Sequence, residues 1–156
     1  MLELEPYYKD IQVIWADLDP NMHMRHTAYS DYATHARICF FVDKGYPLTN
    51  LTREKIGPVL LHESSRYWRE VGIQEHLRIK IELERATEDY SHYTIRHTFI
   101  KNNKKRAARV VIDGAWMDLQ TRQLITPPDL LIKKVLDVMP KTKDFEIVGR
   151  RTYIFL

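Results

Sequence analysis

Residues 15–26 gather an unusual number of reactive side chains in a short stretch. They carry two carboxylates, an amide and two imidazoles: Asp17, Asp19, Asn21, His23 and His26. A carboxylate held in such a loop can attack a carbonyl carbon or take a proton from water. The sequence therefore indicates acyl-transfer or hydrolytic chemistry as one function of this loop.

The same side chains have two other interpretations. Asp17 and Asp19 could cap a turn around Pro20, with His23 and His26 as ordinary surface histidines. A metal site made of the two histidines and an aspartate is also conceivable, although the usual ligand spacing is missing. On the residues alone, all three interpretations stay open.

The elements around this loop are predicted by hydrophobic periodicity. Alternation over Asp10–Trp15 predicts a first strand, and helical spacing over His26–Lys44 predicts a long helix that Gly45 ends. The small residues of this helix, Ala28, Ala33 and Ala36, would let it lie close against a sheet. Its N-terminus, at the end of the loop, would supply N–H groups and a positive dipole end to polarise a carbonyl oxygen.

Four further strands are predicted after this helix. They span Pro58–Glu70, His76–Thr87, Ser91–Lys101 and Lys105–Leu119. Short turns separate them, which predicts an antiparallel sheet, and Asn102-Asn103 would supply the positive φ angles of one hairpin. The last of the four is apolar on both faces and is expected to lie centrally in the sheet.

The C-terminal part, residues 127–156, is predicted to form a helix and a packed tail. Pro127-Pro128-Asp129 would open a helix over Leu130–Met139. The tail Glu146–Leu156 ends in an apolar run that should pack on the domain or on a partner subunit.

Composition limits the class of protein. A chain of 156 residues that is 44% hydrophobic fits one globular domain, residues 1–156. Its single cysteine, Cys39, excludes an intrachain disulfide and fits a reducing compartment, so a cytoplasmic location is expected. No run is long and apolar enough to span a bilayer. The net charge of +3 gives no reason to expect nucleic-acid binding.

Three other features could contribute to a site. Glu63 shares one face of its predicted strand with Ser65 and could assist Asp19 or orient water, or it could simply bond across an interface. Tyr29 could line an acyl tunnel or belong to the core. The basic residues Lys104, Lys105 and Arg106 could bind the phosphates of CoA or an acidic carrier protein, or form a solvated hairpin.

The loop and the start of the helix resemble a known family. The segment Asp17-Leu18-Asp19-Pro20-Asn21-Met22-His23, followed by Tyr29, Tyr32 and Ala36-Arg37, resembles the signature of hotdog-fold thioesterases. These include the 4-hydroxybenzoyl-CoA thioesterase group and the plant acyl-ACP thioesterases. The segment Tyr67–Gly72 is similar to the end of the family's second strand.

The resemblance implies an α+β hotdog fold, in which an antiparallel sheet wraps a long central helix and two copies form the cleft. It implies hydrolysis of an acyl-CoA or acyl-ACP, as in fatty acid metabolism, with no metal and no cofactor. Asp19 falls on the catalytic carboxylate of both groups, and His26 on the carbonyl-polarising N–H. Asn21 and His23 fall on the acyl-ACP group's Asn and His.

Three positions depart from the family pattern. Arg25-His26 stands where many relatives have Asn-Asn, and Arg66 and Val71 stand at the acyl-ACP group's Glu and Cys. Beside hydrolysis, two alternative functions stay open: a hotdog hydratase or dehydratase, and a non-catalytic acyl-CoA-binding module.

Overall fold

The computed structural model describes residues 4–127 and 130–153. Its elements in chain order are β1 (Tyr7–Gln12), the 3₁₀ turn η1 (Trp15–Asp17), α1 (His26–Asp43), α2 (Thr49–Glu54), β2 (Ile56–Tyr67), β3 (His76–Ala86), β4 (His92–Lys101), β5 (Arg106–Asp118), β6 (Leu124–Ile125), α3 (Leu130–Asp137), β7 (Lys141–Ile147) and η2 (Arg150–Tyr153).

The main sheet has the strand order β1-β3-β4-β5-β2, and every pairing along it is antiparallel. The short β6 pairs with β5, and β7 pairs with β3 in the parallel sense. The predicted α+β class and antiparallel main sheet are therefore confirmed. β5 was expected to lie centrally; it is an inner strand between β4 and β2, and β4 is the central one.

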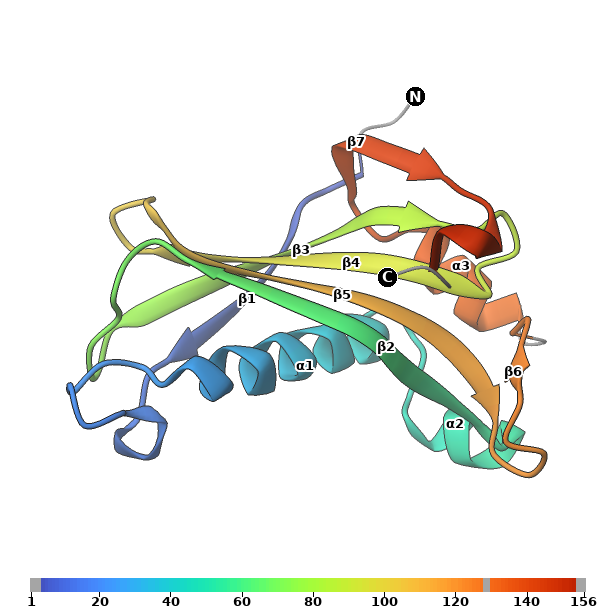
Figure 1. The fold of residues 1–156 in the computed structure, drawn as a ribbon, viewed down its shortest axis with the longest axis horizontal. Coiled ribbons are helices and arrows are strands. Elements are labelled where there is room, and N and C mark those ends of the chain that lie inside the picture. Colours follow the sequence, from blue (N-terminus) through green and yellow to red (C-terminus); the bar gives the residue numbers. More distant parts are fainter. Residues whose placement is uncertain (1–3, 128–129, 154–156) are drawn as a thin grey trace.

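The sheet curves around α1, which lies along its concave side (Figure 1). The helix approaches the strands closely because the side chains of Ala28, Ala33 and Ala36 are small, and all three are fully buried. Gly45 follows α1 with φ of +88°, a conformation that favours glycine, and so ends the helix as predicted.

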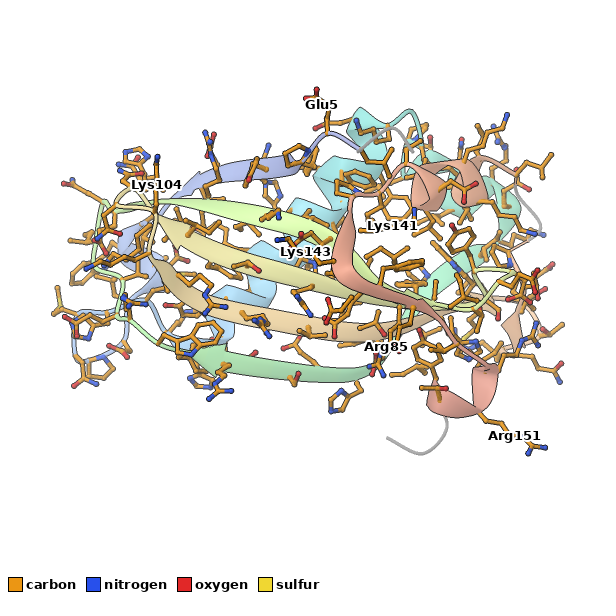
Figure 2. All side chains as sticks on the ribbon, turned by 90° about the horizontal axis from the view of Figure 1, so that it is seen from above. Glu5, Arg85, Lys104, Lys141, Lys143 and Arg151 are labelled. Atoms are coloured by element: carbon orange, nitrogen blue, oxygen red, sulfur yellow. The ribbon has the colours of Figure 1, made fainter. Side chains whose placement is uncertain are left out.

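β7 lies on the opposite side of the sheet from α1 (Figure 1). Seen from above, β7 crosses the half of the sheet near Arg85, whereas the half near Lys104 has no such cover (Figure 2). Tyr153 of the tail is buried and accepts a hydrogen bond from the Thr94 hydroxyl, at 3.3 Å. The tail therefore packs on the domain as far as Tyr153.

Several expectations from the sequence differ from the structure. The first strand ends at Gln12, because Trp15 begins a 3₁₀ turn and is 69% exposed. Residues 49–54, for which no element was predicted, form the short helix α2. In the hairpin between β4 and β5 the positive φ belongs to Lys104, not to Asn102 or Asn103.

Pro128, Asp129 and the last three residues of the tail lie outside the described residues. Within the residues that are described, no helix is long and apolar enough to cross a membrane.

Candidate active site

The loop between η1 and α1 fixes the carboxylate of Asp19. One carboxylate oxygen, Oδ1, accepts hydrogen bonds from the backbone N–H groups of Asn21, at 2.9 Å, and His23, at 3.2 Å. The Asp19 N–H donates to the His23 carbonyl at 2.8 Å, which closes a tight turn with Met22 at positive φ. In the described part of the chain Oδ2 makes no hydrogen bond. Asp19 thus caps a turn through one oxygen, and its other oxygen stays without a partner among the described residues.

Asp17 has a different environment. Its side chain is buried, and Oδ2 accepts from the Tyr32 hydroxyl at 2.6 Å and from the Ile14 N–H at 3.1 Å. Its carbonyl accepts from the Arg25 N–H at 2.7 Å. Burial, and then this bond to Asp17, raise the pKa of Tyr32 to about 12, so the phenol stays a donor. Asp17 ties the loop to α1 and is not open to a substrate.

Asn21 and His23 bond to the Asp19 carboxylate through their backbone N–H groups, and no such bond from their side chains is found among the described residues. Asn21 is exposed, and its contact with Asp19 runs through its backbone N–H. The His23 ring lies beside Glu70, with Nε2 and Oε2 3.4 Å apart. The backbone of His23 also bridges to Gly72. Both residues therefore orient Asp19 by main-chain bonds, and Glu70 is a ring partner that the sequence did not indicate.

An open cavity of about 340 Å³ lies in front of Asp19. Its lining residues are Asp19, Met24, His26, Tyr29, Tyr67, Trp68, Arg69 and Glu70. Of the residues proposed from sequence, the structure brings Asp19, His26 and Tyr29 together here. His26 is the first residue of α1, whose N-cap residue Arg25 makes no side-chain cap. The first turn of the helix therefore faces the cavity without a capping side chain.

Tyr29 forms the inner wall of this cavity. It is buried, and its ring packs edge-on against Tyr67 and Phe99, with centroids 5.1 Å apart in both cases. Burial raises its pKa to about 12. Tyr29 is thus both a core residue and a wall of the cavity.

Glu63 lies on the face of β2 that looks toward α1. Its Oε1 accepts a hydrogen bond from the Ser30 hydroxyl, one helical turn after His26. Glu63 does not line the cavity in front of Asp19. It lies farther along the seam between α1 and β2.

The basic residues separate into two groups. Lys104 and Lys105 are exposed in the hairpin, and the Lys105 N–H donates to the side chain of Asn103 at 3.1 Å. Arg106 instead lies over the Trp68 ring, 4.8 Å from its centroid.

Two more arginines share that ring. Arg66 lies 5.7 Å and Arg109 5.5 Å from the Trp68 centroid. Burial, and then the charges of Arg96 and Arg106, lower the pKa of Arg109. We call Arg66, Trp68, Arg106 and Arg109 the basic patch. Trp68 also lines the Asp19 cavity, so the patch begins where that cavity ends.

The sequence carried a signal for this patch. Arg66 precedes Tyr67 in β2, and the Tyr67 ring contacts the α1 residue Tyr29, so strand alternation places Arg66 on the opposite face. Trp68 follows the end of β2. Register pairs Arg66 with Arg109 on that face. The pairing partner was the part that sequence alone did not supply.

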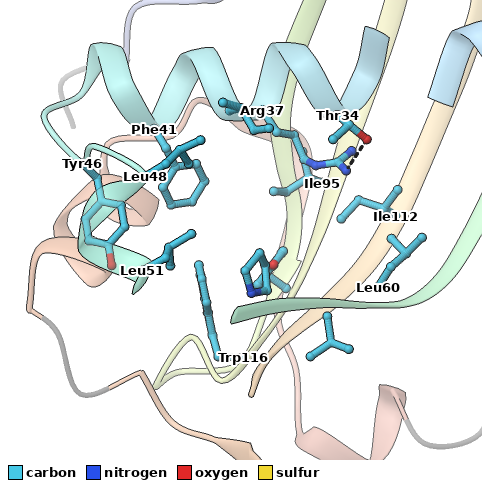
Figure 3. A pocket seen from close by; sticks show the side chains of 14 residues that line it. Thr34, Arg37, Phe41, Tyr46, Leu48, Leu51, Leu60, Ile95, Ile112 and Trp116 are labelled. Carbon is cyan, nitrogen blue, oxygen red and sulfur yellow. Dashed lines mark hydrogen bonds between the residues drawn. The ribbon is translucent and has the colours of Figure 1, made fainter. Parts of the chain in front are cut away.

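A second cavity, of about 260 Å³, lies under the C-terminal half of α1 (Figure 3). Apolar side chains of α1, α2 and the sheet line it, and Arg37 reaches into it from the helix. For metal binding, the described residues offer no group of three or more His, Cys, Asp or Glu side chains with suitable placement.

The sequence matches a known protein family. The family model of the thioesterase-like superfamily matches residues 13–135. The chain belongs to the thioesterase-like superfamily. A search of curated proteins finds no match.

Solved structures agree on the fold at low sequence identity. A Staphylococcus aureus protein in complex with CoA has a TM-score of 0.79 at 16% identity, covering 92% of this chain and 91% of that one. The Synechocystis 1,4-dihydroxy-2-naphthoyl-CoA thioesterase has a TM-score of 0.77 at 13% identity, covering 85% and 96%. A DHNA-CoA thioesterase of Staphylococcus aureus has 0.76 at 15% identity, covering 92% and 99%. This member of the superfamily has the hotdog fold.

Proposed function

We propose that this protein hydrolyses an acyl-CoA thioester to a free acid and CoA, with Asp19 as the catalytic carboxylate. The observation that supports this proposal is the hydrogen bonding and the position of the Asp19 carboxylate. Two backbone N–H groups hold one of its oxygens, and the other makes no hydrogen bond among the described residues. Asp19 also lines a cavity together with His26, the first residue of α1. A carboxylate in that setting is oriented without being neutralised by a cationic partner.

The proposed reaction begins with the thioester carbonyl above the first turn of α1. The N–H of His26 and the positive end of the helix stabilise the negative charge that develops on the carbonyl oxygen. Asp19 takes a proton from a water molecule, which attacks the carbonyl carbon. The tetrahedral intermediate then expels the thiolate, which receives that proton and leaves as the free thiol.

Other residues orient Asp19 or contact the substrate and take no part in the proton transfer. Asn21 and His23 orient the carboxylate through their backbone N–H groups. Tyr29 supplies an apolar wall for the acyl group next to the carbonyl. Glu63 lies farther along the α1–β2 seam, where it would contact the acyl group rather than the attacking water.

The proposed carrier is CoA. The basic patch offers three guanidinium groups and an indole beside the Asp19 cavity, which suits the phosphates and the adenine of a nucleotide. A structural relative in complex with CoA supports the same choice. Lys104 and Lys105 lie in the adjoining hairpin and would add long-range attraction.

A second copy of the chain is proposed to complete the cleft. In the described residues, the outer edge of the twelve-residue β2 has no strand partner, and Leu60 and Leu61 are exposed on it. Long unpaired edges of this kind favour pairing with another chain.

Thiol release from a panel of acyl-CoAs, measured with a thiol-trapping dye, tests the proposal. Wild-type protein should release CoA, and Asp19→Asn should not. Absence of release across short, long and aromatic acyl groups would refute hydrolysis. A hydratase or dehydratase would change the acyl group without releasing thiol.

A further inference from the structure

The cavity under α1 is apolar except for one charged residue. Its walls include Phe41, Leu51, Ile95 and Trp116, and Arg37 is the one charged side chain among the described residues that line it. Figure 3 shows the Arg37 side chain running beneath the helix toward Thr34. Thr34, Tyr46 and Tyr93 add hydroxyl groups to the lining, but none of them is charged. A mainly apolar cavity with a few placed polar groups is typical of a ligand site, and here the one charge would fix one end of the ligand.

Among the described residues, the side chain of Arg37 makes its polar contacts with neutral groups. One terminal nitrogen donates to the Thr34 hydroxyl at 3.0 Å, and the other lies 3.3 Å from Nε2 of His97. The Nδ1 atom of His97 lies 3.0 Å from the Val110 carbonyl, which can only accept, so Nδ1 carries the proton and Nε2 accepts from Arg37. Burial, and then the charge of Arg37, lower the pKa of His97 to about 3. His97 is therefore neutral and adds no counter-charge.

In the ranges that the structure describes, no carboxylate lies within 4.0 Å of the Arg37 guanidinium. Glu63 acts on it only at longer range and accepts its hydrogen bond from Ser30. Burial lowers the pKa of Arg37, yet a guanidinium does not lose its proton in a protein. Arg37 is partly buried. A partly buried charge without an anionic partner loses part of its hydration, and an anionic ligand group would offset that cost.

The position of Arg37 relative to Asp19 sets the size of the ligand. His26, Ser30 and Thr34 follow each other at intervals of four residues, so they share the face of α1 that borders the seam with β2. Because Arg37 reaches back to Thr34, its charge lies about eight residues along the helix from His26, roughly 12 Å at 1.5 Å per residue. An extended chain advances about 1.2 Å per bond, so roughly ten bonds span this distance.

We propose that this cavity receives the far end of an acyl group that terminates in a carboxylate, and that Arg37 binds that carboxylate. This inference rests on the proposed thioesterase function. The substrate class is an ω-carboxyacyl-CoA of about eight to twelve carbons. Its thioester lies at Asp19, and its chain follows the seam past the Ser30–Glu63 contact.

The test compares an ω-carboxyacyl-CoA of ten carbons with its ω-methyl ester, which has nearly the same shape without the charge. Wild-type protein should prefer the acid in kcat/KM. Arg37→Met should lower kcat/KM for the acid about ten- to hundredfold, the range for one hydrogen bond between charged groups, and leave the ester almost unchanged. Arg37→Lys should keep part of the preference. Arg53→Met, an exposed arginine of α2, is the matched control and should change neither substrate.

Two results would overturn the inference. If the wild-type protein preferred the ester, the inference would be wrong. This result does not depend on whether Arg37→Met folds. Equal losses on both substrates in Arg37→Met would make the residue a structural link to His97. If no acyl-CoA is hydrolysed at all, the proposed function fails, and calorimetry with the free ten-carbon dicarboxylic acid still decides: wild type should bind it more tightly than Arg37→Met.

Discussion

Replacement of Asp19 by asparagine should abolish turnover while preserving the loop. The amide oxygen of asparagine can accept the same two N–H groups, from Asn21 and His23, so the turn keeps its bonds. What disappears is the unbonded carboxylate oxygen that takes the proton. Removal of a positioned proton-transfer group lowers kcat by about 10² to 10⁴, which is about 3 to 5 kcal/mol of barrier.

Asp17→Asn is the matched comparison, because this aspartate is two residues away and also accepts hydrogen bonds, but in a buried setting. Its carboxylate holds the Tyr32 hydroxyl and the Ile14 N–H in a buried setting. Weakening them should cost about 1 to 3 kcal/mol of unfolding free energy. For a chain of 156 residues this lowers Tm by roughly 2 to 10 °C. The effect on kcat should be smaller than for Asp19→Asn.

The assay pairs kcat on one good acyl-CoA with a melting curve and with binding of a non-hydrolysable analogue. Asp19→Asn should lose kcat and keep Tm and binding, whereas Asp17→Asn should lose Tm first. Near wild-type kcat in Asp19→Asn would refute the assignment of the catalytic carboxylate. Equal kcat losses in both variants would mean that loop geometry, rather than one oxygen of Asp19, controls the rate.

Three further outcomes are expected. Arg66→Gln combined with Arg109→Gln should raise KM for acyl-CoA more than it lowers kcat, and it should leave KM for short pantetheine thioesters unchanged. Lys104→Gln alone should change KM for acyl-CoA little. Equal effects on both substrate types would exclude phosphate binding by the basic patch. Leu61→Arg should convert an active dimer or tetramer into an inactive monomer by light scattering, and an active wild-type monomer would contradict the shared cleft. Because the pKa of His97 is lowered to about 3, the unfolded chain binds a proton in this pH range that the folded chain does not. The free energy of unfolding should therefore fall as pH drops from about 6.5 toward 3, by about 2 kcal/mol at pH 5. Denaturant unfolding of His97→Gln should lack this pH-dependent component.

The sequence predicted the parts of the fold that have a strong period. The helix predicted over His26–Lys44 is α1, and the strand predicted over Ser91–Lys101 is β4, each with bounds displaced by one residue at most. Both contain enough turns or alternations for the pattern to stand out. In the loop, proximity in sequence is also proximity in space, so the sequence alone was enough to pair Asp19 with His26.

What the sequence did not supply depends on long-range pairing. β7 is polar and short, and it becomes a strand because it adds to the edge of β3, about 60 residues away. The six residues of α2 are too few for helical periodicity to be visible. The contact between Arg37 and His97 joins α1 to β4, and no spacing within either element indicates it.

Two neighbouring faces of α1 have different roles, one in packing and one in substrate binding. One face carries the buried alanines and lets the helix approach the sheet, which a helix with large residues there would prevent. The neighbouring face is therefore held at a fixed distance from β2, and its residues meet the seam at regular intervals of one turn. His26 at the first turn and Arg37 three turns later are separated by the rigid rise of the helix, not by loops that could adjust. If both contact the substrate, selection for acyl length follows from the helix itself. Widening the seam at a buried alanine, for example Ala33→Leu, should then disturb the choice between acyl chains of different length before it disturbs the chemistry at Asp19.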